Sequence, residues 1–439
     1  MIRCASLLCV LVASIAPLQA AQMRGHVVDS SGSAVAKATV YLYWCAPTEG
    51  PLNLPSVYPE WGKHALSDAQ GNFVIDNLDE AKLYSLLVVA EGFVPVQVER
   101  RDCTSEVEAQ VREMPEDRKD PGRMVKGRVL DEQDKPVWGA EVRTVGMKTG
   151  NEHRWGRLQG IDPLTVTDPD GKFVITTHEP DLQLDLRIIK RGFATQLATF
   201  QPPGEQVHEY HLTTGANVTG KLMKDGQPAA DITLGAVQVD ASMEHNTGER
   251  EAVSDDKGVF TFPNLGAKDE YKFYTKMKSA GESGAMTLVQ VTTPGENETG
   301  DLGTVELKPA HTITAKLRVP EGEELPAENV RVTLRRNNAV DSITVAADSD
   351  GVVKLVGVPS GEQVLLLVQA RGFALAPENV SADPALSNRL IGKVDQDLEL
   401  DILLEKSEPG RRRSYTQSDM EKREELFNQR LEGVAKEKK

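Results

Sequence analysis

A turn that recurs four times is the feature of this sequence that most constrains its fold. Each copy begins with aspartate and has glycine three positions later; the four glycines are Gly71, Gly171, Gly258 and Gly351. The glycines lie 100, 87 and 93 residues apart. An opening aspartate can accept hydrogen bonds from the backbone N–H groups that follow it, and glycine adopts positive φ without a Cβ clash. The chain of 439 residues is therefore predicted to be an array of four similar units.

Two further elements recur with nearly the same period. Upstream of each turn a strand opens at a small residue, which is Gly25, Gly127, Gly220 or Ala315. Downstream, a Gly-Phe pair preceded by a charged residue occurs at Glu91–Phe93, Arg191–Phe193 and Arg371–Phe373. The third unit lacks this last element, because no aromatic residue follows its nearest glycine, Gly281.

Short apolar runs between the turns indicate strands. Phe73 and Ile75 are two positions apart, as are Phe260 and Phe262, so each pair can point to one face of its strand. No long helical period interrupts the runs, and 36 glycines and 24 prolines supply many turns. The sequence predicts an all-β chain of four small antiparallel β-sandwich modules, at residues 22–115, 123–214, 216–308 and 310–405.

The connections between these modules are predicted to be short. Thr213–Gly215 and Leu307–Ala310 are joints of a few residues, and Met114–Gly122 is a charged linker bounded by prolines. Short joints between modules favour a semi-rigid array over a flexible chain of domains.

The three repeated elements, in this order, resemble the carboxypeptidase regulatory-like family, whose members are small prealbumin-like sandwiches also grouped with starch-binding-like (carbohydrate-binding-like) folds. The resemblance extends over residues 22–405, with two departures: the third module lacks the Gly-Phe pair, and the fourth has Val353 where the others have Phe. It implies a tandem β-sandwich architecture and a role as an exported accessory, binding or spacer protein. It implies no chemistry, because a fold does not determine a function.

The first 20 residues have the pattern of a secretory signal. Arg3 precedes an apolar stretch over residues 4–18, and the small residue Ala20 follows it. The stretch is short for a spanning helix, so we expect cleavage near Ala20 and a secreted or periplasmic protein that does not span a membrane. The net charge of −16 offers no basic surplus to hold phosphates, so nucleic acid is not an expected partner.

Two cysteines, Cys45 and Cys103, remain after the signal is removed, which in an oxidising compartment predicts one disulfide. Strict alternation places Cys45 on the strand face opposite Val40 and Leu42. Cys103 falls out of register with Val98 in the same way, so the bridge is expected on the outer face. Two free buried thiols are the alternative.

The sequence predicts no catalytic apparatus, metal site or cofactor. None of the eight histidines is followed by glutamate at the His-x-x-Glu spacing of a metallocarboxypeptidase zinc site. The aspartate-rich turns lack the full ligand spacing of a calcium loop, and no nucleophile or phosphate-binding motif occurs. We therefore expect a protein that is not an enzyme.

Aromatic residues in long polar insertions are the candidate binding residues. Tyr58 and Trp61 lie in an insertion of the first module, and His153 and Trp155 lie in a comparable insertion of the second. Flat aromatic faces beside polar groups suit sugar rings or the side chains of a protein partner. The alternative is that each tryptophan folds back onto its own module.

The C-terminal residues 406–439 form a highly charged tail. Ser418 and Glu421 fit a capping box, and a narrow apolar stripe follows at helical spacing, so the tail is expected to be partly helical. It is either a solvated helix or a docking helix for an envelope partner. The sequence as a whole predicts an exported, non-catalytic binding or scaffold protein. The rivals are a carbohydrate-binding protein using the first two modules and an accessory subunit of an envelope complex docking through the tail.

Overall fold

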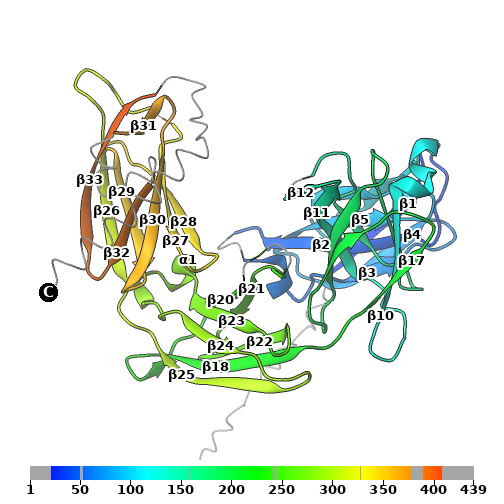
Figure 1. The fold of residues 1–439 in the computed structure, drawn as a ribbon, viewed down its shortest axis with the longest axis horizontal. Helices are drawn as coiled ribbons and strands as arrows, with labels where there is room; N and C mark the ends of the chain where they lie inside the picture. The colour runs from blue at the N-terminus through cyan, green and yellow to red at the C-terminus, as the bar shows by residue number, and fades with distance from the viewer. Residues whose placement is uncertain are drawn as a thin grey trace, which may run out of the picture. The chain divides into compact units, whose positions relative to one another are not determined.

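The computed structural model describes residues 21–49, 53–156, 158–240, 242, 245–326, 328–376 and 389–407, and strands dominate it (Figure 1). The predicted signal peptide, and the predicted tail beyond Ser407, lie outside the described residues. The chain divides into two compact units. The first contains Met1–Glu49 and Lys63–Met114; the second contains Gly50–Gly62 and Pro115–Lys439. The predicted all-β fold with four tandem sandwich modules is confirmed.

Module 1 forms two sheets and a short ribbon. Its strands are β1 (Ala21–Val28), β2 (Thr39–Pro47), β3 (His64–Leu66), β4 (Asn72–Leu78), β5 (Lys82–Val89), β6 (Phe93–Val94), β7 (Val96–Arg101), β8 (Val107–Gln110) and β9 (Arg112–Glu113). The sheets have the orders β4-β1-β8 and β3-β2-β5-β7, and β6 pairs with β9. The 3-10 helix η1 (Pro55–Val57) lies between β2 and β3 in the sequence, but its segment belongs to the second unit.

Module 2 begins the second unit. It contains η2 (Glu116–Lys119), η3 (Pro121–Arg123), β10 (Met124–Leu130), β11 (Glu141–Thr149), β12 (Glu152–Trp155), β13 (Leu164–Val166), β14 (Lys172–Thr176), β15 (Gln183–Ile189), β16 (Gln196–Gln201) and β17 (Val207–His211). Its sheets are β14-β10-β17 and β12-β11-β15-β16, with β13 beside β11. One apolar cluster takes residues from both sheets, including Val129, Phe173, Leu186 and Tyr210.

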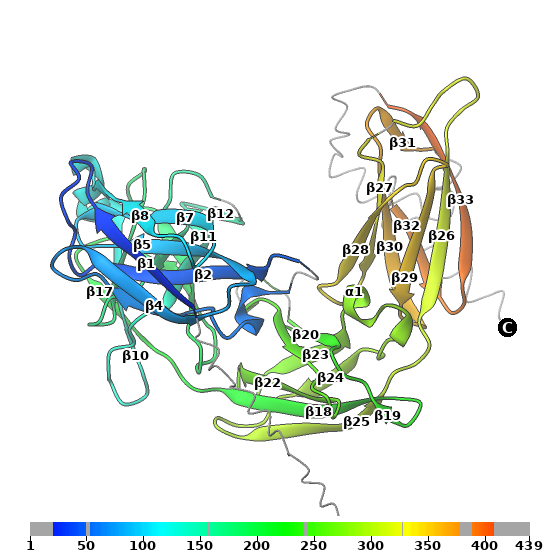
Figure 2. The same ribbon diagram turned by 180° about the vertical axis from the view of Figure 1, so that it is seen from behind.

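Module 3 follows with one short helix among its strands. It contains β18 (Ala216–Lys224), β19 (Gln227–Pro228), β20 (Thr233–Gln238), β21 (Arg250–Val253), β22 (Val259–Leu265), β23 (Glu270–Thr275), α1 (Met277–Ala280), η4 (Gly281–Ser283), β24 (Val289–Thr292) and β25 (Thr299–Glu306). The sheets are β19-β18-β22, with β25 beside β18, and β21-β20-β23-β24. Strands β18 and β25 lie side by side in both views (Figure 2).

Module 4 has two four-stranded sheets. Its strands are β26 (His311–Arg318), β27 (Arg331–Arg336), β28 (Ser342–Ala346), β29 (Val352–Val358), β30 (Glu362–Gln369), β31 (Phe373–Leu375), β32 (Arg389–Val394) and β33 (Leu398–Lys406). The orders are β29-β26-β33-β31 and β28-β27-β30-β32. Buried residues of both sheets, such as Ile313, Leu334 and Leu366, form its core.

One strand pair in each module is parallel, and this refines the predicted antiparallel sandwich. The first and last long strands of each module run side by side in the same direction; the pairs are β1 with β8, β10 with β17, β18 with β25, and β26 with β33. The hairpin and neighbour pairs around them are antiparallel.

The predicted aspartate turn is confirmed in all four modules. In module 1, Oδ1 of Asp68 accepts hydrogen bonds from the backbone N–H groups of Gln70 at 2.9 Å and Asn72 at 2.8 Å. Gly71 has a φ of 80°, and a Cβ there would lie 2.5 Å from the carbonyl oxygen of Val27. The same bonds recur at Asp168, Asp255 and Asp348. The turn thus places a glycine where neither a left-handed backbone nor a close carbonyl tolerates a side chain.

The small residue of the upstream strand lies directly opposite the aromatic residue that follows the turn. The opposed pairs are Gly25 with Phe73, Gly127 with Phe173, Gly220 with Phe260, and Ala315 with Val353. A Cβ on Gly127 would lie 2.3 Å from the ring of Phe173, so the ring occupies the space above the glycine. In module 4 the small Ala315 lies opposite the medium-sized Val353, so these two side chains together fill the space that glycine and phenylalanine fill in the other modules.

The predicted disulfide is wrong: Cys45 and Cys103 are not bonded to each other, and both are buried. A bulge at Tyr43 shifts the register of β2 against β5, so Cys45 lies opposite Tyr84 and shares a face with Leu42. A second bulge in β7, where Arg100 has a φ of 50°, moves Cys103 inward in the same way. One extra residue reverses the face of every later side chain, so simple alternation placed both thiols on the wrong side. Burial raises the pKa of the Cys103 thiol, which keeps it protonated.

The predicted linker before module 2 is folded onto that module. Residues 116–119 and 121–123 form η2 and η3. Arg118 extends to Asp162 with an N–O distance of 3.3 Å, and both side chains are largely buried. The N–H of Asp181 donates to the carbonyl of Gly122 at 2.8 Å. This segment is therefore part of the module rather than a free spacer.

Candidate functional site

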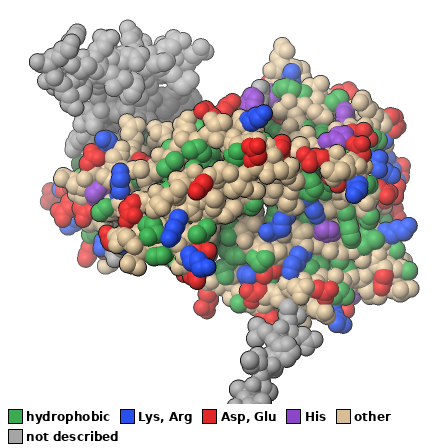
Figure 3. All heavy atoms as spheres, turned by 90° about the horizontal axis from the view of Figure 1, so that it is seen from below, with side chains coloured by type: hydrophobic (Ala, Val, Ile, Leu, Met, Phe, Trp, Pro, Cys, Tyr) green, Lys and Arg blue, Asp and Glu red, His purple; other side chains and the backbone are tan. Residues whose placement is uncertain are grey.

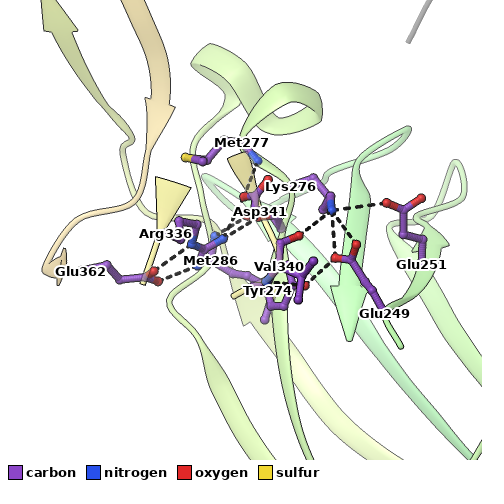
Figure 4. Close-up of polar contacts among 11 residues, drawn as sticks. Glu249, Glu251, Tyr274, Lys276, Met277, Met286, Arg336, Val340, Asp341 and Glu362 are labelled. Atoms are coloured by element: carbon purple, nitrogen blue, oxygen red, sulfur yellow. Dashed lines mark hydrogen bonds and ion pairs between the residues drawn. The ribbon is translucent and has the colours of Figure 1, made fainter. Parts of the chain in front are cut away.

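A cluster of buried charged side chains joins modules 3 and 4 (Figure 4). We call it the joint cluster; its members are Glu249, Glu251, Tyr274, Lys276, Arg336, Asp341 and Glu362. The first four come from β21, β23 and the residues beside them, and the last three come from β27, the loop after it and β30. The cluster therefore combines two modules that the sequence treats as separate units.

Arg336 is the centre of the module 4 side, and it is fully buried. Its guanidinium donates to both carboxylate oxygens of Glu362, at 2.8 Å and 2.6 Å. Nη1 donates to the backbone carbonyl of Thr275 at 2.8 Å and to Asp341 at 3.4 Å. Asp341 in turn accepts the backbone N–H of Met277 at 3.0 Å. Both modules are thus needed to satisfy one arginine and one aspartate.

Lys276 is the matching cation on the module 3 side. Its ammonium lies 2.8 Å and 2.9 Å from the two carboxylate oxygens of Glu249, and 3.4 Å from Glu251. It also donates to the backbone carbonyl of Val340 in module 4, at 2.9 Å. The N–H of Val340 donates to the hydroxyl of Tyr274, which donates to Glu249. Module 3 therefore binds both the carbonyl and the N–H of Val340, in the short loop after β27.

Burial and pairing act in opposite directions on the pKa values of this cluster. Burial lowers the pKa of Lys276, but the carboxylates of Glu249 and Glu251 raise it more, so the net shift is upward. Burial raises the pKa of Glu249 by more than Lys276 lowers it, and the like charge of Glu251 adds to that rise. The short contacts of both Glu249 oxygens with the ammonium favour an ionised pair, whose carboxylate would protonate readily without its cation.

The apolar core of module 4 also crosses the joint. Met277 of α1 is 1% exposed and belongs to the buried cluster of module 4. In module 4, Gly357 has a φ of 84°, and a Cβ there would lie 2.6 Å from the carbonyl oxygen of Met277. In the sequence, α1 and η4 stand where the other modules have the Gly-Phe pair. In module 3 the Gly-Phe pair is thus replaced by a short helix whose Met277 side chain packs into the core of module 4.

The chemistry of the joint cluster is structural. Its carboxylates and cations are paired with each other or with backbone groups. Within the described ranges, no group of three or more His, Cys, Asp or Glu side chains is placed to hold a metal ion. The arrangement can fix the geometry of two modules.

The structure does not present Trp61 as an exposed platform. Its side chain is 6% exposed, and the guanidinium of Arg191 from module 2 lies 5.7 Å from the ring centroid. The carbonyl oxygen of Tyr58 accepts a hydrogen bond from the same arginine at 2.6 Å. The ring of Trp61 is therefore buried, and its insertion packs within the second unit rather than onto module 1.

His153 and Trp155 lie together on β12, and both are partly exposed. Their ring centroids are 3.6 Å apart, and Nε2 of His153 lies 2.5 Å from Oδ2 of the buried Asp185. Phe200, 4.9 Å from the His153 ring, donates its backbone N–H to the same aspartate at 2.9 Å. A face of Trp155 is therefore covered by His153.

The sequence analysis missed the joint cluster, although one signal for it was present. In β27 the buried residues alternate as Val332, Leu334 and Arg336, so an arginine occupies the inward register of a strand. A charge in that register requires a buried partner, which can come from another module. The identity of the partners could not be read from the sequence, because they lie 61 and 26 residues away along the chain.

Acidic and basic side chains are interspersed on the molecular face shown in Figure 3, with hydrophobic side chains between them. That face carries no continuous basic area of the kind that binds nucleic acid. In the described part of the chain, no helix is long and apolar enough to cross a membrane.

No known protein family profile and no curated protein sequence matches this chain. Among solved structures it is similar to the minor pilin GBS52 of Streptococcus agalactiae, with 12% identity, a TM-score of 0.24, and coverage of 46% of this chain and 100% of the pilin. It is also similar to the shaft pilin SpaA of Lactobacillus rhamnosus GG, with 14% identity, a TM-score of 0.20, and coverage of 45% and 98%. The Bacillus anthracis TIE protein has 10% identity, a TM-score of 0.19, and coverage of 88% and 73%. These values are low, so the roles of those proteins are not transferred to this chain.

Proposed function

We propose that this chain is an exported, non-catalytic scaffold in which modules 3 and 4 are held in a fixed arrangement. The observation that carries the proposal is the joint cluster, in which Arg336 is fully buried and bonded to groups of both modules. A flexible spacer gains nothing from burying charges at its joints, because each buried charge must be fully paired to avoid a large desolvation cost. A rigid scaffold requires such directional contacts, which are satisfied in one geometry only.

Export rests on the predicted signal in residues 1–20, with a secreted or periplasmic location as the expectation. A partner protein in the envelope or outside the cell is the proposed client of the scaffold. Carbohydrate binding through His153 and Trp155 is the alternative, and docking through the tail beyond residue 406 is the second one.

Distance measurements between modules 3 and 4 test the scaffold proposal. We would introduce spin labels at Lys257→Cys and Asp350→Cys, two exposed positions in the aspartate turns of modules 3 and 4. The expected result is one narrow distance distribution that R336M broadens. R318M is the matched control, since Arg318 pairs with Asp401 at the surface of the same module. A distribution already broad in the wild type contradicts a fixed joint.

Ligand screens on the same mature chain distinguish the alternatives. A glycan array and a pull-down from native envelope extract report on carbohydrate and protein partners respectively. Binding to glycans that W155A abolishes without unfolding would support the carbohydrate alternative. A specific protein captured by the full chain, and lost when residues 408–439 are removed, would support docking through the tail.

A further inference from the structure

The segment Asn53–Gly62 interrupts module 1 in the sequence, yet it belongs to the second unit. We propose that Arg191 of module 2 and Glu251 of module 3 form a docking site for the backbone of this segment, which then closes the joint between those two modules. This goes beyond the scaffold role, because it assigns a peptide-binding surface and its occupant.

Glu251 forms the module 3 half of the docking site. Its carboxylate is 5% exposed, and Oε2 accepts the backbone N–H of Leu54 at 2.6 Å. Oε1 faces Lys276 at 3.4 Å, so the carboxylate is shared between the segment and the joint cluster. A buried carboxylate that receives a backbone amide forms a strong, charge-assisted hydrogen bond. Helix η1 lies beside β21, the strand that carries Glu251.

Arg191 forms the module 2 half. Its Nη2 lies 2.6 Å from the carbonyl oxygen of Tyr58, 3.3 Å from that of Ser56 and 3.4 Å from that of Trp61. These carbonyls converge because the segment turns twice, with Tyr58 N–H bonded to Pro55 and Trp61 N–H bonded to Tyr58. One guanidinium nitrogen thus donates to three backbone carbonyl oxygens of the folded segment.

The recognition is directed mainly at backbone groups. Glu251 takes an N–H near the start of the segment, and Arg191 takes carbonyls along the rest of it. Trp61 adds a side-chain anchor, since its buried ring lies 5.7 Å from the Arg191 guanidinium. Because the two receptor residues belong to different modules, one bound segment connects both. Its occupant is this chain's own residues 53–62.

Proteolysis of the full mature chain tests the docking. Trp61, which is followed by Gly62, is the chymotrypsin site inside the segment, and docking protects it. The prolines after Leu54 and Tyr58 block cleavage at those two residues. We expect R191A to increase the rate of cleavage within residues 53–62 at least tenfold in native buffer, as measured by mass spectrometry. R154A is the matched control, because Arg154 is an exposed arginine of the same module paired only with Glu152. Equal cleavage rates in wild type and R191A would overturn the proposal.

Two further measurements keep the test decisive if R191A perturbs folding. Hydrogen exchange should show the Leu54 amide protected in wild type and at least tenfold less protected in E251A. In a full-length chain whose residues 51–61 are replaced by a Gly-Ser stretch of equal length, a labelled peptide of residues 51–64 should bind, and R191A should weaken that binding at least tenfold. Failure of the Leu54 amide to show protection, or binding of the peptide unaffected by R191A, contradicts the docking site and leaves the module 3–4 scaffold proposal standing.

Discussion

The two joints of the second unit are built differently. Between modules 2 and 3, Glu296 accepts hydrogen bonds from the hydroxyl of Thr213 at 3.0 Å and the N–H of Gly215 at 2.6 Å, close to the surface. Between modules 3 and 4, Arg336 and Asp341 are almost completely buried, and Met277 extends the core of one module into the other. The Glu296 contacts replace water with hydrogen bonds near the surface, whereas Arg336 and Asp341 are charges in an interior.

This difference predicts how each joint responds to damage. A surface hydrogen bond that is lost is replaced by water, so the free energy of unfolding falls only slightly. A buried charge that loses its partner has no water to replace it, so the whole desolvation cost appears at once. The buried contacts of Arg336 and Asp341 should therefore fail together, and the loss of the Glu296 contacts should cost little.

The largest effect is expected for R336M. Removing the guanidinium leaves Asp341 and Glu362 without their cation, which should cost about 3–5 kcal/mol. Calorimetry should show modules 3 and 4 melting together in the wild type and separating in the variant. The surface control R318M should change the unfolding free energy by about 0.5 kcal/mol. If both variants lost a similar amount of unfolding free energy, the buried pairs of the joint would not differ from an exposed ion pair.

M277A should follow, with a loss of about 2–4 kcal/mol from the cavity left in the core of module 4. The location of the effect distinguishes this variant, because the substituted residue belongs to module 3 in the sequence but packs in the core of module 4. Hydrogen exchange should accelerate in β29 of module 4, against which α1 packs. If protection falls only in module 3, Met277 does not serve the neighbouring core.

K276M should destabilise by about 2 kcal/mol at neutral pH, because Glu249 and Glu251 lose their ammonium partner. Burial already raises the pKa of Glu249 above its ordinary value of 4.5, and loss of the cation raises it further. The native variant then binds more protons than its unfolded chain between pH 4.5 and the raised pKa, so its stability increases as pH falls through that range. Urea unfolding at about pH 5 and about pH 7.5 measures this.

The matched control for pH is K126M, whose partner Glu205 is exposed. It should change stability little, and almost equally at both pH values. A loss in K276M that is the same at the acidic and the neutral pH would show that the carboxylates are not the source of the effect.

The smallest effect is expected at the Glu296 contacts of the module 2–3 joint. E296Q keeps an acceptor for Thr213 and removes only the charge, so the loss should be about 1 kcal/mol or less. The melting temperature, and the rates of amide hydrogen exchange in β16 and β25, should change only modestly. A loss comparable to that of R336M would mean that the two joints do not differ in kind.

The sequence predicted local structure that depends on neighbours in the chain. Asp68 and Gly71 defined a turn because their chemistry is complete within a few residues, and Phe73 followed as an inward anchor. The face of Cys45 could not be predicted, because the bulge at Tyr43 depends on the pairing of β2 with β5. Alternation is reliable only as long as the register is unbroken.

The joints were beyond local reasoning for a different reason. Arg336 contacts Thr275 only because two modules pack together. The sequence around Arg336, Thr275 and Glu362 gives no sign of the contacts among them. Trp61 lies in a polar insertion, and the neighbouring sequence leaves open whether its ring is a ligand platform or folds back onto its own module. The ring is buried instead, because Arg191 of module 2 and Glu251 of module 3 bind the backbone of its segment. The bounds 310–405 predicted for the fourth module leave out Met277, although its side chain packs in the core of that module.

The parallel pairing of the first and last strands in each module determines how tension would pass through the chain. In module 4, β26 and β33 run in the same direction and pair from Ile313 with Leu398 to Arg318 with Leu403. A force that pulls on both ends of the module acts along the two strands in opposite senses. It shears the whole ladder of hydrogen bonds together, whereas an antiparallel hairpin pulled from its open end would separate one bond at a time. The parallel pair in each module should therefore resist stretching along the chain. This resistance should be measured as a slow rate of forced unfolding.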